Sequence, residues 1–93
     1  MTRPLSMIDI ESASRSAFSP DPEQRYLFVA DATNGKIRIL NREDGTEVGS
    51  IGHRGHQAGQ FDQIEYMAFD SQGNLYVTEV APNTRIQKFV PIA

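Results

Sequence analysis

The stretch LFVADATNGKIRIL at residues 27–40 decides the fold, because the chain carries a second version of it, LYVTEVAPNTRIQKF, at residues 75–89. Each copy contains an apolar segment, an acidic residue, a turn with asparagine, and a segment in which polar and apolar residues alternate. A repeated segment of this kind is the main sequence signature of a repeat architecture. The sequence therefore predicts two related structural units.

The two copies align with small differences that fall in turns. Leu27 corresponds to Leu75 at an offset of 48 residues. Asn34 corresponds to Asn83 at an offset of 49, which makes Pro82 a one-residue insertion. Length changes in turns at a constant strand pattern are expected of repeats.

Both units predict short antiparallel strands. Residues 26–31 are apolar and rich in β-forming side chains, which is typical of a strand buried on both faces, and residues 36–41 alternate as in a half-buried strand. Asn34-Gly35 and Asp44-Gly45 are strong hairpin signals. No helix is indicated. We expect strands at 13–18, 26–31, 36–41 and 46–51 in the first unit, and at 64–69, 75–80 and 85–90 in the second.

A glycine-rich connector, GHRGHQAGQF at residues 52–61, joins the two units. Its glycines predict a surface loop with unusual φ angles. Phe61 is expected to anchor the end of this loop in the core. We expect a single domain over residues 1–93, with an N-terminal segment, the first unit and the connector in 1–61 and the second unit in 62–93. The fourth strand of the second unit is missing, and residues 4–9, with their apolar segment, are candidates to supply it to their own chain or to a neighbour.

The composition restricts the class of protein. Without cysteines, the chain cannot form disulfides or a Cys-based zinc site. A net charge of −3 argues against non-specific binding to nucleic acid or to anionic membranes. The N-terminus lacks a long apolar run, so the sequence as written predicts a cytoplasmic protein, or a secreted or periplasmic one if a signal has been trimmed.

Taken together, the two copies and the connector resemble the NHL repeat over roughly residues 17–90. The wider pattern is similar to the C-terminal repeats of bacterial six-bladed NHL proteins, which are relatives of the peptidyl-hydroxyglycine lyases. The matching residues are Phe28, Val29, Asp31, Asn34, Lys36, Ile37 and Leu40 in the first copy, Gly55, Gly59 and Phe61 in the connector, and Tyr76, Val77, Glu79, Asn83, Arg85, Ile86 and Phe89 in the second copy.

The resemblance implies an all-β fold of two four-stranded antiparallel propeller blades. Two blades share one interface and leave two apolar faces bare, and such faces mark association sites. Three identical chains would close a six-bladed β-propeller through head-to-tail contacts, so we expect a homotrimer. Another ring size, an open dimer, or a piece cut from a longer propeller are the alternatives.

Four side chains are candidates for a metal site. Asp31 and Glu79 occupy equivalent repeat positions and could form an acidic ring that holds a divalent cation, because carboxylate oxygens suit such ions. The alternative is that each bonds turn amides or pairs with Lys36 and Arg85. His53 and His56 in the connector could ligate a metal with a third ligand from elsewhere, or lie in solvent.

Three further residues are candidates for ligand binding. Arg54 could form a small basic patch with the two histidines for an anionic ligand, or be solvated. Glu65 and Tyr66 begin the predicted innermost strand of the second unit and could face a channel, and core packing of Tyr66 is the alternative.

Two functions of different classes follow. The first is a non-catalytic NHL-type module, an oligomer-forming scaffold that binds a protein or small ligand and needs no cofactor, with neither nucleic acid nor membrane as its partner. The second is a lyase or lactonase-type enzyme with a channel metal assembled by a symmetric ring. A gene fragment without its own function is the third possibility. Fold alone does not choose among them.

Overall fold

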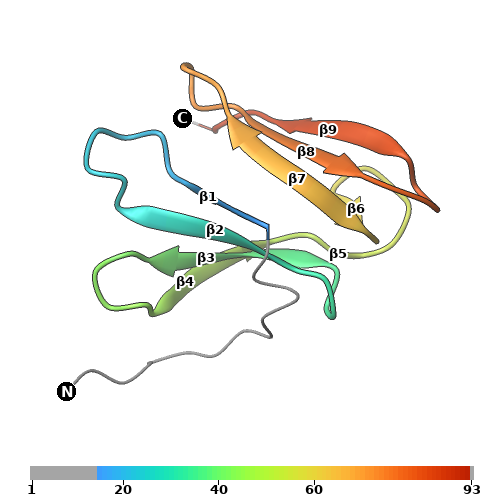
Figure 1. Ribbon diagram of the computed structural model, residues 1–93, viewed down its shortest axis with the longest axis horizontal. Coiled ribbons are helices and arrows are strands. Elements are labelled where there is room, and N and C mark those ends of the chain that lie inside the picture. Colours follow the sequence, from blue (N-terminus) through green and yellow to red (C-terminus); the bar gives the residue numbers. More distant parts are fainter. Residues whose placement is uncertain (1–14, 93) are drawn as a thin grey trace.

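The computed structural model describes residues 15–92, and within this range the protein is all-β. A four-stranded antiparallel sheet in the order β1-β2-β3-β4 is followed by a short parallel pair, β5-β6, and by a three-stranded antiparallel sheet, β7-β8-β9 (Figure 1). The strands are β1 (Ser16–Phe18), β2 (Tyr26–Asp31), β3 (Lys36–Asn41), β4 (Glu47–Ile51), β5 (His53–Arg54), β6 (Gln60–Phe61), β7 (Ile64–Phe69), β8 (Leu75–Glu79) and β9 (Arg85–Phe89).

The predicted strands of both units are present. β2, β3 and β7 have the predicted bounds, and β4, β8 and β9 are each one residue shorter. β1 begins at Ser16, and the predicted residues 13 and 14 lie outside the described range. Residues 4–9, the candidates for the missing fourth strand of the second sheet, also lie outside it.

Strand pairing confirms that the two sheets are copies of one unit. Phe28 pairs with Ile39 in the first sheet, and the aligned residues Tyr76 and Lys88 pair in the second. The correspondence extends across three strands. Ala17, Phe28 and Ile39 lie in one row of the first sheet, and their aligned residues Ala68, Tyr76 and Lys88 lie in one row of the second. The inserted Pro82 lies in the β8–β9 turn, so it leaves the register unchanged.

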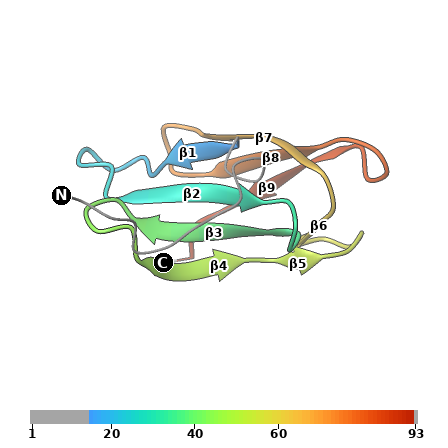
Figure 2. The ribbon, with the colours of Figure 1, turned by 60° about the horizontal axis from the view of Figure 1, so that its bottom comes forward.

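The two sheets pack against each other through one apolar face of each (Figure 2). Their first strands, β1 and β7, lie side by side. Phe28 of the first sheet and Phe69 of the second meet edge to face, with ring centroids 4.9 Å apart, a geometry that aromatic pairs favour. The buried core contains Ala30, Ile37, Phe61, Ile64, Met67, Leu75 and Val77.

The connector lies at the surface with positive φ angles at its three glycines, as predicted, and it also contains a strand pair that was not predicted. Its two ends form the parallel pair β5-β6, in which His53 lies opposite Gln60 and Arg54 opposite Phe61. Phe61 is fully buried, as predicted, and packs on Phe89 with ring centroids 5.7 Å apart. The glycines allow the chain to fold back sharply, and this brings the two ends close enough to pair.

Gly52 makes the turn from β4 into the connector, with φ of +77°. A Cβ there would lie 2.5 Å from the Phe61 ring and 2.7 Å from the Gly59 carbonyl oxygen, whereas Gly45, with φ of +76°, has open space around it. We expect Gly45→Ala to lower the free energy of unfolding by about 1 kcal/mol through the backbone alone. Gly52→Ala should lower it by about 1–3 kcal/mol more through overpacking. Urea unfolding of the two variants at one protein concentration tests this, and equal effects would contradict it.

Candidate functional site

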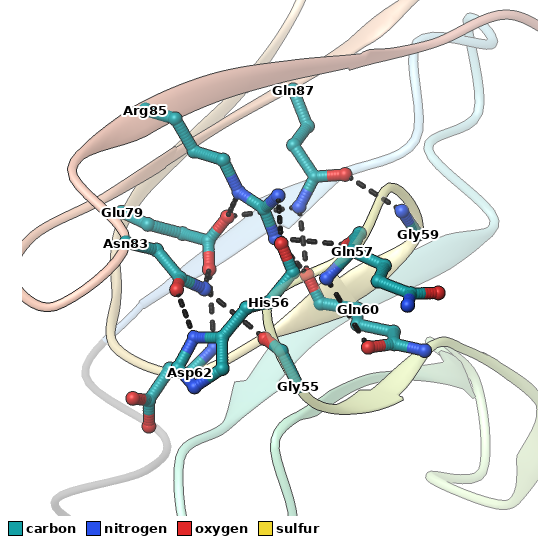
Figure 3. Close-up of polar contacts among 10 residues, drawn as sticks. All are labelled: Gly55, His56, Gln57, Gly59, Gln60, Asp62, Glu79, Asn83, Arg85 and Gln87. Carbon is teal, nitrogen blue, oxygen red and sulfur yellow. Dashed lines mark hydrogen bonds and ion pairs between the residues drawn. The ribbon is translucent and has the colours of Figure 1, made fainter.

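A buried carboxylate at the end of β8 organises the polar contacts between the second sheet and the connector (Figure 3). The Glu79 side chain is fully shielded from solvent, and each of its two oxygens accepts two hydrogen bonds. The donors are the Asp62 backbone N–H at 3.1 Å, Asn83 Nδ2 at 2.8 Å, Arg85 Nε at 2.8 Å and Gln87 Nε2 at 2.8 Å.

Arg85 extends this network to the connector. Its Nη1 donates to the His56 carbonyl oxygen at 2.8 Å, and its Nη2 donates to the carbonyl oxygens of Gln57 at 3.0 Å and Gln60 at 2.6 Å. A planar guanidinium with five N–H donors suits this fan of acceptors better than a lysine would. The Glu79–Arg85 pair therefore fastens the connector to the second sheet, and the predicted pairing of these two residues is confirmed.

The network keeps Glu79 ionised. Burial raises the pKa of this carboxyl group, but the hydrogen bonds from Asn83, Arg85 and Gln87 outweigh it, so the pKa lies below its ordinary value. Four donors fill the positions at which a carboxylate accepts, so Glu79 has a structural role within the chain. A metal ion at Glu79 would have to displace at least one of these donors.

Asp31 has a smaller version of this environment. Its carboxylate accepts hydrogen bonds from Asn34 Nδ2 at 2.8 Å and from Arg38 Nε at 2.6 Å. The predicted partner Lys36 is wrong. Lys36 lies directly across from Asp31, whereas Arg38 is its diagonal neighbour on the same face and also bonds Glu47 at 2.6 Å. Burial raises the pKa of Asp31, but these hydrogen bonds hold it below its ordinary value.

The two connector histidines make separate local contacts. His56 bonds Asn83 through its Nδ1, and the His53 Nδ1 lies 3.1 Å from the Arg54 carbonyl oxygen. Over residues 15–92, no three or more His, Asp or Glu side chains are grouped so that they could hold a metal ion. The four predicted metal candidates therefore form no joint site within one chain.

Arg54 fastens the connector to the first sheet. Its Nη1 donates to Asp62 at 2.7 Å, and its Nη2 donates to the carbonyl oxygens of Ala32 at 2.6 Å and Thr33 at 2.8 Å in the β2–β3 turn. These contacts resemble those of Arg85 on the other side of the connector. The Arg54 guanidinium thus bonds within the chain through both Nη1 and Nη2 although its side chain is 50% exposed, and the basic patch with His53 and His56 stays a prediction.

A surface groove of about 430 Å³ runs beside the adjacent strands β1 and β7, and it contains two of the predicted ligand-binding residues. Glu65 is the extra residue of a β-bulge, since Ile64 and Tyr66 face consecutive residues of β8. Bulges redirect side chains and often occur beside functional sites. The groove is lined by Arg15, Ser16, Glu65, Tyr66 and Met67.

Core packing, the alternative role considered for Tyr66, is wrong for the single chain. The side chain is 63% exposed, because Tyr66 lies in one row with Thr78 and Ile86 on the face that turns away from the first sheet. Tyr66 therefore presents an aromatic ring and a hydroxyl group at the groove, a combination that suits contacts with amphipathic ligands.

Sequence reasoning missed the role of Gln87 and gave Asn83 only a turn role. The signal was present: Gln87 follows Arg85 by two residues and so lies on the same face of β9. The connector carbonyl groups that Arg85 and Asn83 recognise could not be found, because nothing in the sequence shows where a glycine-rich segment folds back.

Asp70 caps the β7–β8 turn and gives the protein a measurable acid response. Its carboxylate accepts hydrogen bonds from the Asn74 side chain and backbone N–H at 3.0 Å, and from the Gln72 N–H and Tyr76 hydroxyl at 2.9 and 3.2 Å. These donors, the Asn74 side chain first among them, lower the pKa of Asp70 from 3.8 to about 2.

Because the folded-state pKa is depressed, the Asp70 carboxylate stabilises the turn above pH ~4, and this contribution is lost as the pH falls toward 2. We expect a carbon-detected NMR titration of its carboxyl group to give a midpoint near pH 2. In Asp70→Asn the acid response of the neighbouring Asn74 amide should disappear. A midpoint near the value of an unfolded aspartate would contradict the capping role.

Comparison with known proteins adds no family assignment, since neither a protein-family model nor a curated protein matches the sequence. In the part of the chain that the structure describes, no helix has the length and apolar character needed to span a membrane.

Proposed function

We propose that this protein is an NHL-type blade pair that closes a six-bladed ring as a homotrimer and serves as a non-catalytic binding scaffold. The observation that carries the proposal is the face of the second sheet that turns away from the first sheet, on which large apolar side chains are exposed. On it, Tyr66 is 63% and Ile86 69% exposed, and Val80 and Val90 beside it are 40% and 63% exposed.

The physical reason lies in the number of sheets. Two sheets share one interface, and the Phe28–Phe69 contact shows how well that interface packs. A second apolar face of this kind on a small protein marks an association site. β9 is also an edge strand of its sheet, and an unpaired edge favours further association. In a closed ring of three chains with two sheets each, every sheet packs both of its faces against neighbouring sheets.

The ligand-binding role is assigned to the groove beside β1 and β7. In a closed ring of this architecture the first strand of each sheet lies nearest the axis, so three grooves would surround the channel mouth. Glu65 and Tyr66 offer a carboxylate and an aromatic ring there. This set suits a protein segment or a small polar ligand with an apolar part.

The contacts of Glu79 and Asp31 favour binding over channel-metal chemistry. Both carboxylates already accept hydrogen bonds from the side chains of their own sheet. Metal analysis of the purified protein compares the two functions: a stoichiometric ion for each ring would favour the lyase or lactonase type of enzyme, and its absence would favour the scaffold.

Light scattering coupled to size-exclusion chromatography tests the assembly. Three chains of 10.4 kDa predict a mass of about 31 kDa that persists on tenfold dilution from micromolar concentrations. A mass of 10.4 kDa at those concentrations would overturn the proposal.

A further inference from the structure

The repeat alignment assigns a counterpart to each face of each sheet. The front face of the first sheet is the one formed by Ala17, Phe28, Ala30, Ile37 and Ile39, and its counterpart in the second sheet is formed by Ala68, Tyr76, Thr78, Ile86 and Lys88. The back face of the second sheet is formed by Met67, Phe69, Leu75, Val77 and Phe89, and its counterpart in the first sheet by Ser16, Phe18, Leu27, Val29 and Leu40.

The interface within the chain joins the front face of the first sheet to the back face of the second. Ala30 and Ile37 on one side, and Met67, Leu75 and Val77 on the other, belong to one buried core. The front face of the second sheet and the back face of the first are thus the two faces that this interface does not use.

Equivalent residues differ sharply in exposure. Ile37 is fully buried, whereas its counterpart Ile86 is 69% exposed. Phe69 is partly buried against Phe28, whereas its counterpart Phe18 is 44% exposed, with the Arg42 guanidinium over its ring, 4.8 Å from the centroid. Ile86 and Phe18 are thus exposed copies of residues that the internal contact uses, whereas Val29, the counterpart of the buried Val77, is itself only 3% exposed.

We propose that the front face of the second sheet packs on the back face of the first sheet of a second copy of this chain. In this contact Tyr76 and Ile86 take the places of Phe28 and Ile37, and Phe18 of the other copy takes the place of Phe69. The inference rests on the proposed self-association and specifies it. The two surfaces differ, so the contact is head-to-tail and can continue until a ring closes.

The substitutions between the repeats show how this contact differs from the internal one. Phe28 becomes Tyr76, Ala30 becomes Thr78 and Ile39 becomes Lys88, so the surface used between chains is more polar than the surface used within the chain. Lys88 lies over the Tyr76 ring, 5.7 Å from its centroid, and covers part of it in the single chain. Interfaces that assemble from folded chains are typically more polar than a protein core. The internal contact is therefore the stronger of the two.

A complementation experiment tests the pairing of these faces. Ile86→Glu places a charge on the front face and leaves the back face intact, and Phe18→Glu does the reverse. We expect each purified variant to have a mass of 10.4 kDa, and their equimolar mixture to form a heterodimer of about 21 kDa through the one intact pair of faces. Both side chains are exposed in the single chain, so circular dichroism should show native β content for each variant.

The controls separate this inference from the proposed ring. Ala58→Glu, at an exposed residue of the connector outside both sheets, should keep the wild-type mass. The assignment of faces is wrong if Phe18→Glu keeps the wild-type mass, or if the mixture stays at 10.4 kDa while the wild type is a trimer. Neither of these results would contradict the proposed trimeric ring. A monomeric wild type would overturn the ring itself, together with this contact.

Discussion

Glu79→Gln is expected to lower the free energy of unfolding by about 3–5 kcal/mol, the usual cost of removing one partner of a buried ion pair. All four groups that face this carboxylate are donors, and Arg85 is one of them. A glutamine keeps one accepting oxygen and turns its own NH₂ group toward the remaining donors. The total stability of a 93-residue domain is about 5–14 kcal/mol, so the loss is a large part of it.

Urea unfolding followed by circular dichroism measures this effect, at one protein concentration because assembly contributes to stability. Glu23→Gln is the matched control, since the Glu23 side chain is 74% exposed and its removal should change stability by about 0.5 kcal/mol or less. The loss in Glu79→Gln should shrink as the pH falls through the lowered pKa of Glu79, because the wild-type carboxylate is then protonated as well. Equal stability of the two variants at pH 7 would show that the network does not hold the connector.

Phe61→Ala is expected to lower the free energy of unfolding by about 3–5 kcal/mol, the range for removing a buried aromatic side chain. Phe61 is fully buried at the end of the connector and packs on the Phe89 ring. The same ring lies beside Gly52, where no space is left for a Cβ. The alanine variant therefore leaves a cavity where the connector meets the second sheet.

Thermal unfolding and urea unfolding both report this loss, and Ile92→Ala, at a 98% exposed residue, is the control with an expected change of about 0.5 kcal/mol or less. We also expect faster amide exchange at Arg54, whose strand β5 pairs with Phe61. Wild-type stability in Phe61→Ala would mean that the connector lies on the protein rather than in its core.

The strands could be predicted from the sequence because the two repeats support each other. An apolar run such as residues 26–31 is ambiguous when read alone. Its recurrence at residues 75–79, followed each time by a turn and an alternating segment, removes the ambiguity. Phe61 could also be identified as an anchor, since it is the only large apolar residue among the polar and glycine residues of the connector.

The connector and the partner of Asp31 could not be predicted in the same way. Pairing of β5 with β6 depends on backbone torsions that several glycines leave open. The choice of Arg38 over Lys36 depends on whether the directly opposite residue or the diagonal neighbour reaches the carboxylate, and both basic residues are present in the sequence. Recurrence drew attention to Glu79 and Asp31 as metal candidates, yet the same recurrence is equally expected of a structural carboxylate in each sheet.

Small-angle X-ray scattering of the wild-type protein tests most directly whether the exposed face of the second sheet is covered in solution. One chain has a Cα radius of gyration of 13.1 Å. A compact ring of three chains should have a radius of gyration of about 19 Å, with a forward scattering that corresponds to three chains. A radius near 13 Å and a forward scattering of one chain would contradict the account, because the face of Tyr66 and Ile86 would then be in contact with water.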